Sequence, residues 1–135
     1  MMNAIESGDT CRRPPVPWSL SGTLADLERS GELEFVRDLI DAFLRDTAAR
    51  LESMRKAAAC ADLEALAACS HTLKGSTLLM NAGRLAELCR EIEQHARERK
   101  DRDYAAMVDQ LDLVLRETSA AMVSHADTLP RSAVR

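Results

Sequence analysis

Aromatic side chains are scarce in this chain, at 3% of its 135 residues, and only five glycines and four prolines occur. This scarcity disfavours a β-sheet protein, whereas the abundant Ala, Leu, Glu and Arg favour helices. No apolar run approaches the roughly 20 residues that a transmembrane helix requires. The N-terminus also lacks the apolar core of a signal peptide. These absences predict a cytoplasmic, all-α protein that does not enter a membrane.

Basic character is lacking as well. The formal net charge is -4, and no basic stripe is interleaved with aromatic residues, so nucleic-acid binding is not expected. The four cysteines include no C-x-x-C pair, and we interpret three of them as small buried apolar residues rather than as a disulfide framework. Cys69 and His71 diverge by about 160° on a helix, and no zinc-type spacing occurs, so no metal site is predicted.

Apolar residues recur at three- and four-residue steps in four long segments, which predicts helices over about 32–59, 62–80, 85–96 and 104–122. In the first of these, the core-facing stripe is expected at Val36, Ile40, Phe43, Thr47, Leu51, Met54 and Ala58. A short helix precedes them in SGTLADLERSG, capped by Ser21 or Thr23 and ended by Gly31. Because the connections are short, we predict an up-and-down antiparallel four-helix bundle with a short additional N-terminal helix as a lid.

The ends of the chain are expected to lie outside this bundle. Residues 1–17 lack periodicity and end in a proline cluster, so they are predicted to form a flexible arm. The bundle is expected to occupy residues 18–126, with Trp18 against its edge, and residues 127–135 to form a flexible tail. The opening Met-Met and the short tail favour a complete small protein.

One histidine is predicted to point away from the core. The inward stripe of its helix comprises Leu63, Leu66, Ser70, Leu73, Thr77 and Met80. His71 lies roughly 140° from the centre of that stripe. Within about 60° of His71 lie Glu64, Ala67, Ala68, Lys74, Gly75 and Leu78.

Such a histidine is usually an ordinary surface residue, so its neighbours carry the argument. Gly75 weakens a helix interior by about 1 kcal/mol relative to alanine, and this cost favours a function. Without a side chain, Gly75 leaves a notch where the backbone of another protein can approach. We therefore predict a docking face around His71, with Leu78 as an apolar contact.

This arrangement suits phosphoryl transfer. A neutral imidazole is a good nucleophile near neutral pH, and the Lys74 ammonium, three residues on, would offset the charge of a phosphoryl group. Neither G-x-x-x-x-G-K-[ST] nor G-x-G-x-x-G occurs in the chain. The phosphoryl group is therefore expected to arrive on another protein, and the chain is not expected to be an enzyme with its own nucleotide site.

The segment HTLKGS, followed by LAELCREIE, resembles the signature of histidine phosphotransfer (HPt) domains, and the resemblance spans roughly residues 19–123. It implies that His71 is the phosphoacceptor, that Lys74 stabilises the phosphoryl group and that Gly75 clears space for a receiver domain. The implied partners are response-regulator receiver domains and a sensor or hybrid histidine kinase. Family members need no cofactor of their own, because the receiver brings the Mg²⁺. A monomer is expected.

Two positions depart from the family pattern. Asn81 and Ala82 stand where Gly-Ala is common, so the turn after the histidine helix is expected to differ in shape. Some members place a glutamine on the next helix that hydrogen-bonds the imidazole; here Glu93 matches it, with Gln94 beside it. Both are candidates for orienting His71.

Two other interpretations compete with a phosphocarrier. The dimerisation domain of histidine kinases also presents a helical histidine, but Thr72 follows it here instead of Glu, and no proline occurs between Pro17 and Pro130. A non-catalytic adaptor that binds a receiver or kinase domain without carrying phosphate would use the same face. His95 and His125 are interpreted as structural or surface residues.

Overall fold

The computed structural model describes Trp18 and residues 22–130 of the chain. The predicted arm over 1–17, the candidate cap Ser21 and the end of the predicted tail over 131–135 lie outside the described residues. Within them, the chain forms helices and no strand. The helices are α2 (Gly22–Arg29), α3 (Leu33–Ala59), α4 (Leu63–Leu79), α5 (Gly83–Arg97) and α6 (Tyr104–Ala126).

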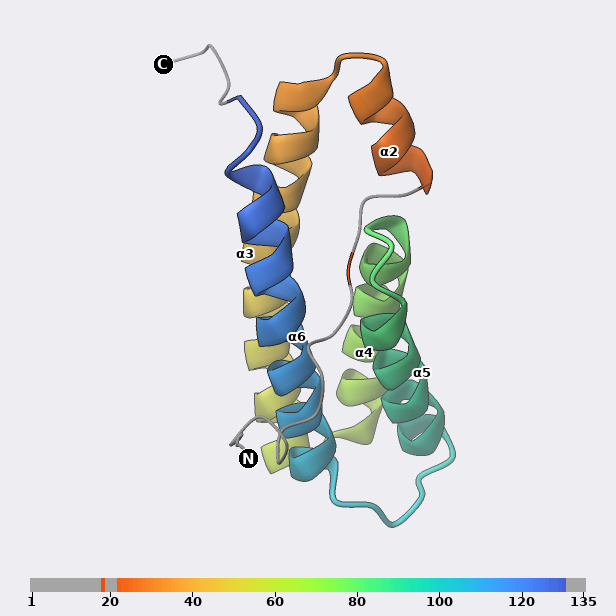
Figure 1. Ribbon diagram of the computed structural model, residues 1–135. Helices are drawn as coiled ribbons and strands as arrows, with labels where there is room; N and C mark the ends of the chain where they lie inside the picture. Colours follow the sequence, from red (N-terminus) through yellow and green to blue (C-terminus); the bar gives the residue numbers. More distant parts are fainter. Residues whose placement is uncertain (1–17, 19–21, 131–135) are drawn as a thin grey trace, which may run out of the picture.

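The four long helices form an up-and-down antiparallel bundle, as predicted. Figure 1 shows the α3–α6 pair beside the α4–α5 pair, with α2 folded over one end of the bundle. Each long helix packs against two others: α3 and α5 each contact both α4 and α6. The four helices therefore surround a common core. The short helix α2 packs against α3. None of the described helices is long and apolar enough to span a bilayer.

Local sequence signals explain where the helices begin and end. Asp62 and Asp103 cap α4 and α6, because their carboxylates accept hydrogen bonds from the amides of Ala65 and Ala106. After α4, Asn81 adopts a left-handed conformation with φ of 58°, and the amide of Ala82 bonds back to the Thr77 carbonyl at 2.8 Å. Asparagine tolerates this conformation, so Asn81 takes the part that glycine usually plays at a helix end.

The core is built from the inward faces of all four long helices. Most of the predicted stripe is buried, including Val36, Leu66 and Met80. Ala58 was expected in the core, but Ala57 is the buried residue at that end of α3 and Ala58 is only partly buried. Buried hydroxyls are satisfied within their own helix, as when Ser70 donates to the Leu66 carbonyl at 2.8 Å.

The end of the bundle beneath α2 is held by polar contacts. The indole N–H of Trp18 donates to the Met80 carbonyl at 2.9 Å, and its ring meets the His125 ring edge-on at 5.9 Å. His125 Nε2 lies 2.9 Å from the Glu28 carboxylate, which ties α2 to α6. Arg37, although charged, is buried and donates to the Ala126 carbonyl.

Candidate functional site

His71 lies about midway along α4 and is exposed, with 61% of its side chain accessible. Its neighbours Ser70 and Leu73 are buried, so the core lies on the opposite side of the helix. The prediction that His71 faces solvent is therefore confirmed. The ring is nevertheless held by one contact with the adjacent helix.

That contact comes from Glu93 on α5. Its Oε2 lies 3.0 Å from His71 Nδ1, and only 13% of the Glu93 side chain is exposed. An ionised carboxylate only accepts hydrogen bonds, so the neutral imidazole must carry its proton on Nδ1. Within the described residues, Nε2 has no hydrogen-bond partner, and it belongs to a largely exposed ring. Gln94, the other candidate, instead donates to Glu98 at 3.3 Å and does not reach His71.

Two cations hold the Glu93 carboxylate in place. Lys74 Nζ lies 3.3 Å from Oε1, and Arg97 Nε donates to Oε2 at 3.0 Å. Burial, the largest single influence, opposes ionisation of this carboxyl. The hydrogen bonds from Arg97 and Lys74 and the charges of Lys74 and His71 outweigh it, so the pKa of Glu93 is lowered. His71, Lys74, Glu93 and Arg97 thus form one connected group, which we call the His71 cluster.

The surface next to His71 is open at Gly75. A Cβ built on Gly75 meets no atom within 4 Å, so the helix backbone beside His71 borders open space, and the approach of a partner there stays a prediction. Glu64 and Ala68 are exposed, and Leu78 is 60% accessible.

Ala67 is the exception on the predicted docking face, because it is only 2% accessible. Helix α4 contacts α5 more extensively than α3, so its buried arc extends past the stripe to Ala67. Ala67 belongs to the same core cluster as Ala96 of α5. The expectation that it lies on the exposed face is wrong.

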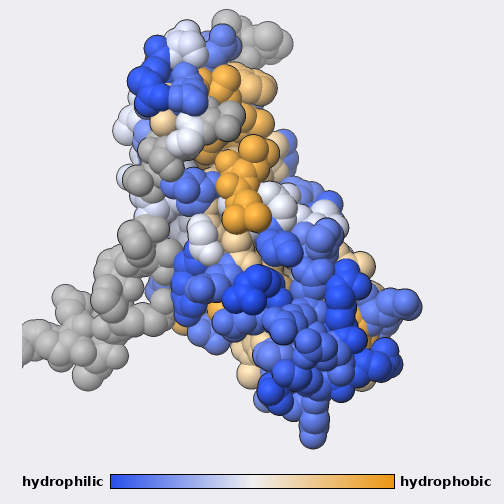
Figure 2. Space-filling model, turned by 90° about the vertical axis from the view of Figure 1, so that its right-hand side faces the viewer, coloured by the Kyte–Doolittle hydropathy of each residue, from blue (hydrophilic) through white to orange (hydrophobic). Residues whose placement is uncertain are grey.

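An apolar groove next to Leu78 was not predicted from the sequence. A groove of about 200 Å³ between α3 and α4 is lined mainly by apolar side chains, among them Leu39, Phe43 and Leu79. Leu79 and Phe35 are more than half exposed. Figure 2 shows the side of the molecule that lies on the right in Figure 1. A hydrophobic strip covers part of its upper half, above a mostly hydrophilic lower half. Two adjacent exposed leucines, Leu78 and Leu79, were the available sequence signal.

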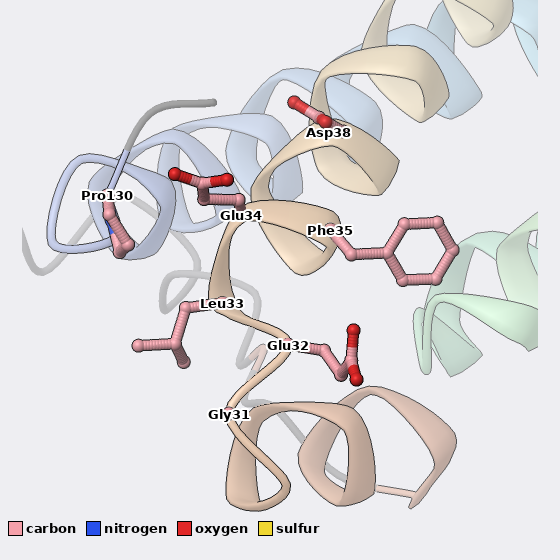
Figure 3. A pocket seen from close by; sticks show the side chains of 7 residues that line it. All are labelled: Gly31, Glu32, Leu33, Glu34, Phe35, Asp38 and Pro130. Atoms are coloured by element: carbon pink, nitrogen blue, oxygen red, sulfur yellow. The ribbon is translucent and has the colours of Figure 1, made fainter. Parts of the chain in front are cut away.

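A larger hollow, of about 490 Å³, lies where α2 joins α3, at the end of the bundle and away from His71. Three carboxylates line it, from Glu32, Glu34 and Asp38, and in Figure 3 they point in different directions. Such a surface repels a phosphoryl group and offers it no cation. This hollow therefore does not suit a phosphoryl group, whereas the His71 cluster combines an exposed imidazole with two cations.

The described cysteines, Cys60, Cys69 and Cys89, do not belong to a candidate metal site. Among the described residues, no three His, Cys, Asp or Glu side chains are grouped so that they could hold a metal ion. The expectation of three buried cysteines is wrong, because Cys60 is exposed, Cys69 is half-buried and only Cys89 is buried among those described. Burial raises the pKa of the Cys89 thiol to about 12, although the Lys74 charge opposes this effect.

Comparisons with known proteins agree with this geometry. The model of the Hpt domain family matches residues 38–121, which include the whole His71 cluster. Histidine-containing phosphotransfer protein B (HptB) from Pseudomonas aeruginosa PAO1 has a similar crystal structure, with a TM-score of 0.72 and 28% sequence identity. The match covers 78% of this chain and 90% of that one. A search among curated proteins gave no match.

Proposed function

Because the chain belongs to the Hpt domain family, we propose that His71 is the residue through which this histidine phosphotransfer protein carries phosphoryl groups in a phosphorelay. The observation that supports this most directly is the 3.0 Å contact between His71 Nδ1 and Glu93. It fixes the imidazole tautomer and leaves the Nε2 lone pair available on a largely exposed ring. A nucleophile held in this way needs only a donor brought to it in line.

The donor is a phosphorylated aspartate on a receiver domain. Nε2 attacks phosphorus, the P–O bond to the aspartate breaks, and its electron pair remains on the departing carboxylate. The Nδ1 proton stays on the ring, which becomes cationic, and Glu93 offsets that charge. Transfer to the next receiver reverses these steps.

The chain's other residues supply charge neutralisation rather than covalent chemistry. Lys74 lies one turn from His71 and can stabilise the oxygens of the phosphoryl group. Mg²⁺ is expected on the receiver, and the chain itself is a phosphocarrier without a nucleotide site.

The receiver docks on a surface defined by Gly75, Leu78, Leu79 and the groove between α3 and α4. Gly75 provides close approach next to His71, and the groove continues the apolar surface along α4. An apolar patch that adjoins the reacting residue suits a partner that must seat its aspartate over Nε2. Glu64 and Ala68 lie on the same face of α4 as His71 and extend the docking surface on the side of His71 opposite Gly75. We propose that the carrier acts as a monomer, with receiver domains and a sensor or hybrid histidine kinase as its partners.

Labelling experiments test the assignment. Candidate receivers, phosphorylated on aspartate with labelled acetyl phosphate and Mg²⁺, are mixed with the wild type, His71→Gln, His95→Gln or His125→Gln. We expect acid-labile, base-stable label on the wild type and on both control variants, and none on His71→Gln. Label that persists on His71→Gln, or receivers that bind the wild type without labelling it, would overturn the assignment; the second outcome would identify an adaptor.

A further inference from the structure

A carboxylate beside the phosphoacceptor creates an electrostatic conflict. Glu93 holds the Nδ1 proton of His71, but its negative charge also lies close to the place where an anionic phosphoryl group must bind. Its low exposure keeps solvent from screening that repulsion fully. A neutral amide at this position would orient the ring without this penalty, so the carboxylate needs a compensating charge.

Arg97 supplies that compensation from the next turn of α5. Its Nε binds the same oxygen, Oε2, that contacts His71 Nδ1, at 3.0 Å in both cases. Lys74 binds the other oxygen, Oε1. With a neutral imidazole, the two cations exceed the one carboxylate by one unit, and the His71 cluster is net positive. Without Arg97, that excess disappears, and only Lys74 remains to face both the carboxylate and the phosphoryl group.

Other charged groups near Glu93 do not take over this function. Arg90 and Gln94 of α5, and Glu98 directly after its end, line the same shallow hollow as Lys74, Glu93 and Arg97. Glu98 is paired with Lys100 at 3.2 Å. Among the described contacts of Glu93, only those from His71, Lys74 and Arg97 reach its carboxylate.

We propose that Arg97 is a positioning residue for phosphoryl transfer: it fixes and neutralises Glu93, so that this carboxylate orients His71 without repelling the phosphoryl group on Nε2. The inference rests on the proposed function of His71 and extends it to a residue that the sequence did not single out. A glutamate–arginine pair one turn apart also occurs simply as a stabilising pair on a helix surface. The two roles differ in one respect: replacing a positioning Arg97 should slow phosphoryl transfer only when Glu93 is present.

The test uses the full chain and phosphoramidate, a small anionic donor that needs no docking surface. Nε2 attacks the phosphorus of the zwitterionic donor, whose nitrogen is already protonated. The P–N bond breaks, its electron pair leaves with ammonia, and the Nδ1 proton remains on the imidazole ring. Initial rates are compared for the wild type, Arg97→Gln, Arg97→Lys, Glu93→Gln and the double variant Glu93→Gln/Arg97→Gln. His71→Gln gives the background.

We expect Arg97→Gln to slow labelling about fivefold, the upper range for a partly exposed ion pair. Arg97→Lys should retain most of the wild-type rate, because a lysine also pairs with a glutamate one turn earlier. In the double variant, the loss of Arg97 should cost nothing relative to Glu93→Gln, because no carboxylate remains to be neutralised. The defect of Arg97→Gln should also shrink as salt rises from about 0.05 M to about 1 M.

The proposal is overturned if Arg97→Gln labels at the wild-type rate, or if its defect is equally large with Gln at position 93. The second result would mean that Arg97 only supports α5, and thermal melts of the variants would then show a matching loss of stability. Failure of the proposed function gives a different outcome, in which His71→Gln labels as well as the wild type.

Discussion

Replacing Gly75 with alanine should stabilise the protein, although this glycine lies next to the reactive histidine. Gly75 is exposed in the interior of α4, and an added Cβ would meet no atom within 4 Å. The substitution therefore recovers the helix propensity of alanine, about 1 kcal/mol, without a steric cost. With a urea m-value of about 2 kcal/mol/M, the unfolding midpoint should rise by about 0.5 M.

A large side chain at the same position should separate folding from docking. Gly75→Leu also removes the glycine penalty, so the fold should remain at least as stable as the wild type. The leucine fills the notch that a receiver needs, so transfer from a phosphorylated receiver should fall by at least about tenfold, the effect of losing roughly 1.4 kcal/mol of docking energy. Labelling by phosphoramidate should change little, because this donor is small.

Ala120 provides matched controls, since it is also exposed in the interior of a long helix, α6. Ala120→Gly should lower stability by about the amount that Gly75→Ala raises it, and Ala120→Leu should leave transfer from receivers intact. The reasoning is refuted if Gly75→Ala lowers the urea midpoint, since the glycine would then serve the fold. It is refuted equally if Gly75→Leu still accepts phosphoryl groups from receivers at the wild-type rate.

Two further predictions follow from the surroundings of ionisable groups. Because the pKa of Glu93 is lowered from 4.5 in the folded protein, the unfolded state binds more protons than the folded state as the pH falls below this value. The Glu93 carboxylate therefore stabilises the fold above that pH, and this stabilisation is lost as the pH falls through the pKa of the folded state. Glu93→Gln should flatten this acid limb in urea titrations between about pH 3 and pH 6, and an unchanged limb would contradict the ion-pair geometry. Burial raises the pKa of the Cys89 thiol to about 12, so iodoacetamide should modify exposed Cys60 in the native protein and spare Cys89 until urea is added. Peptide mass spectrometry measures the modification of each cysteine. Equal modification of Cys60 and Cys89 in the native protein would show that α5 opens readily.

The fold could be predicted from sequence because each long helix carries its own signals. Asp62 and Asp103 mark two helix starts, and the apolar steps mark the inward faces. Contacts between distant helix ends could not be predicted in this way. Helix α6 continues to Ala126, whose carbonyl accepts a hydrogen bond from buried Arg37, and no local pattern in α6 encodes that contact.

The site was predictable to the same extent. His71, Lys74 and Gly75 lie within two turns of one helix, so helical geometry alone places them together. Glu93 was one of two candidates on α5, and only the packing of α5 against α4 shows that Glu93, rather than Gln94, reaches the imidazole. Ala67 was misplaced for the same reason, because the buried width of α4 depends on how closely α5 approaches.

Trp18 has a practical consequence for studying this carrier. It is the single tryptophan of the chain, and its indole donates to the carbonyl of Met80, a residue that also lines the groove between α3 and α4. The molecule thus has an intrinsic fluorophore at the rim of the surface where we place the receiver. Its emission offers a label-free gauge of occupancy, so a partner without tryptophan can be titrated against the unmodified protein to obtain a binding isotherm.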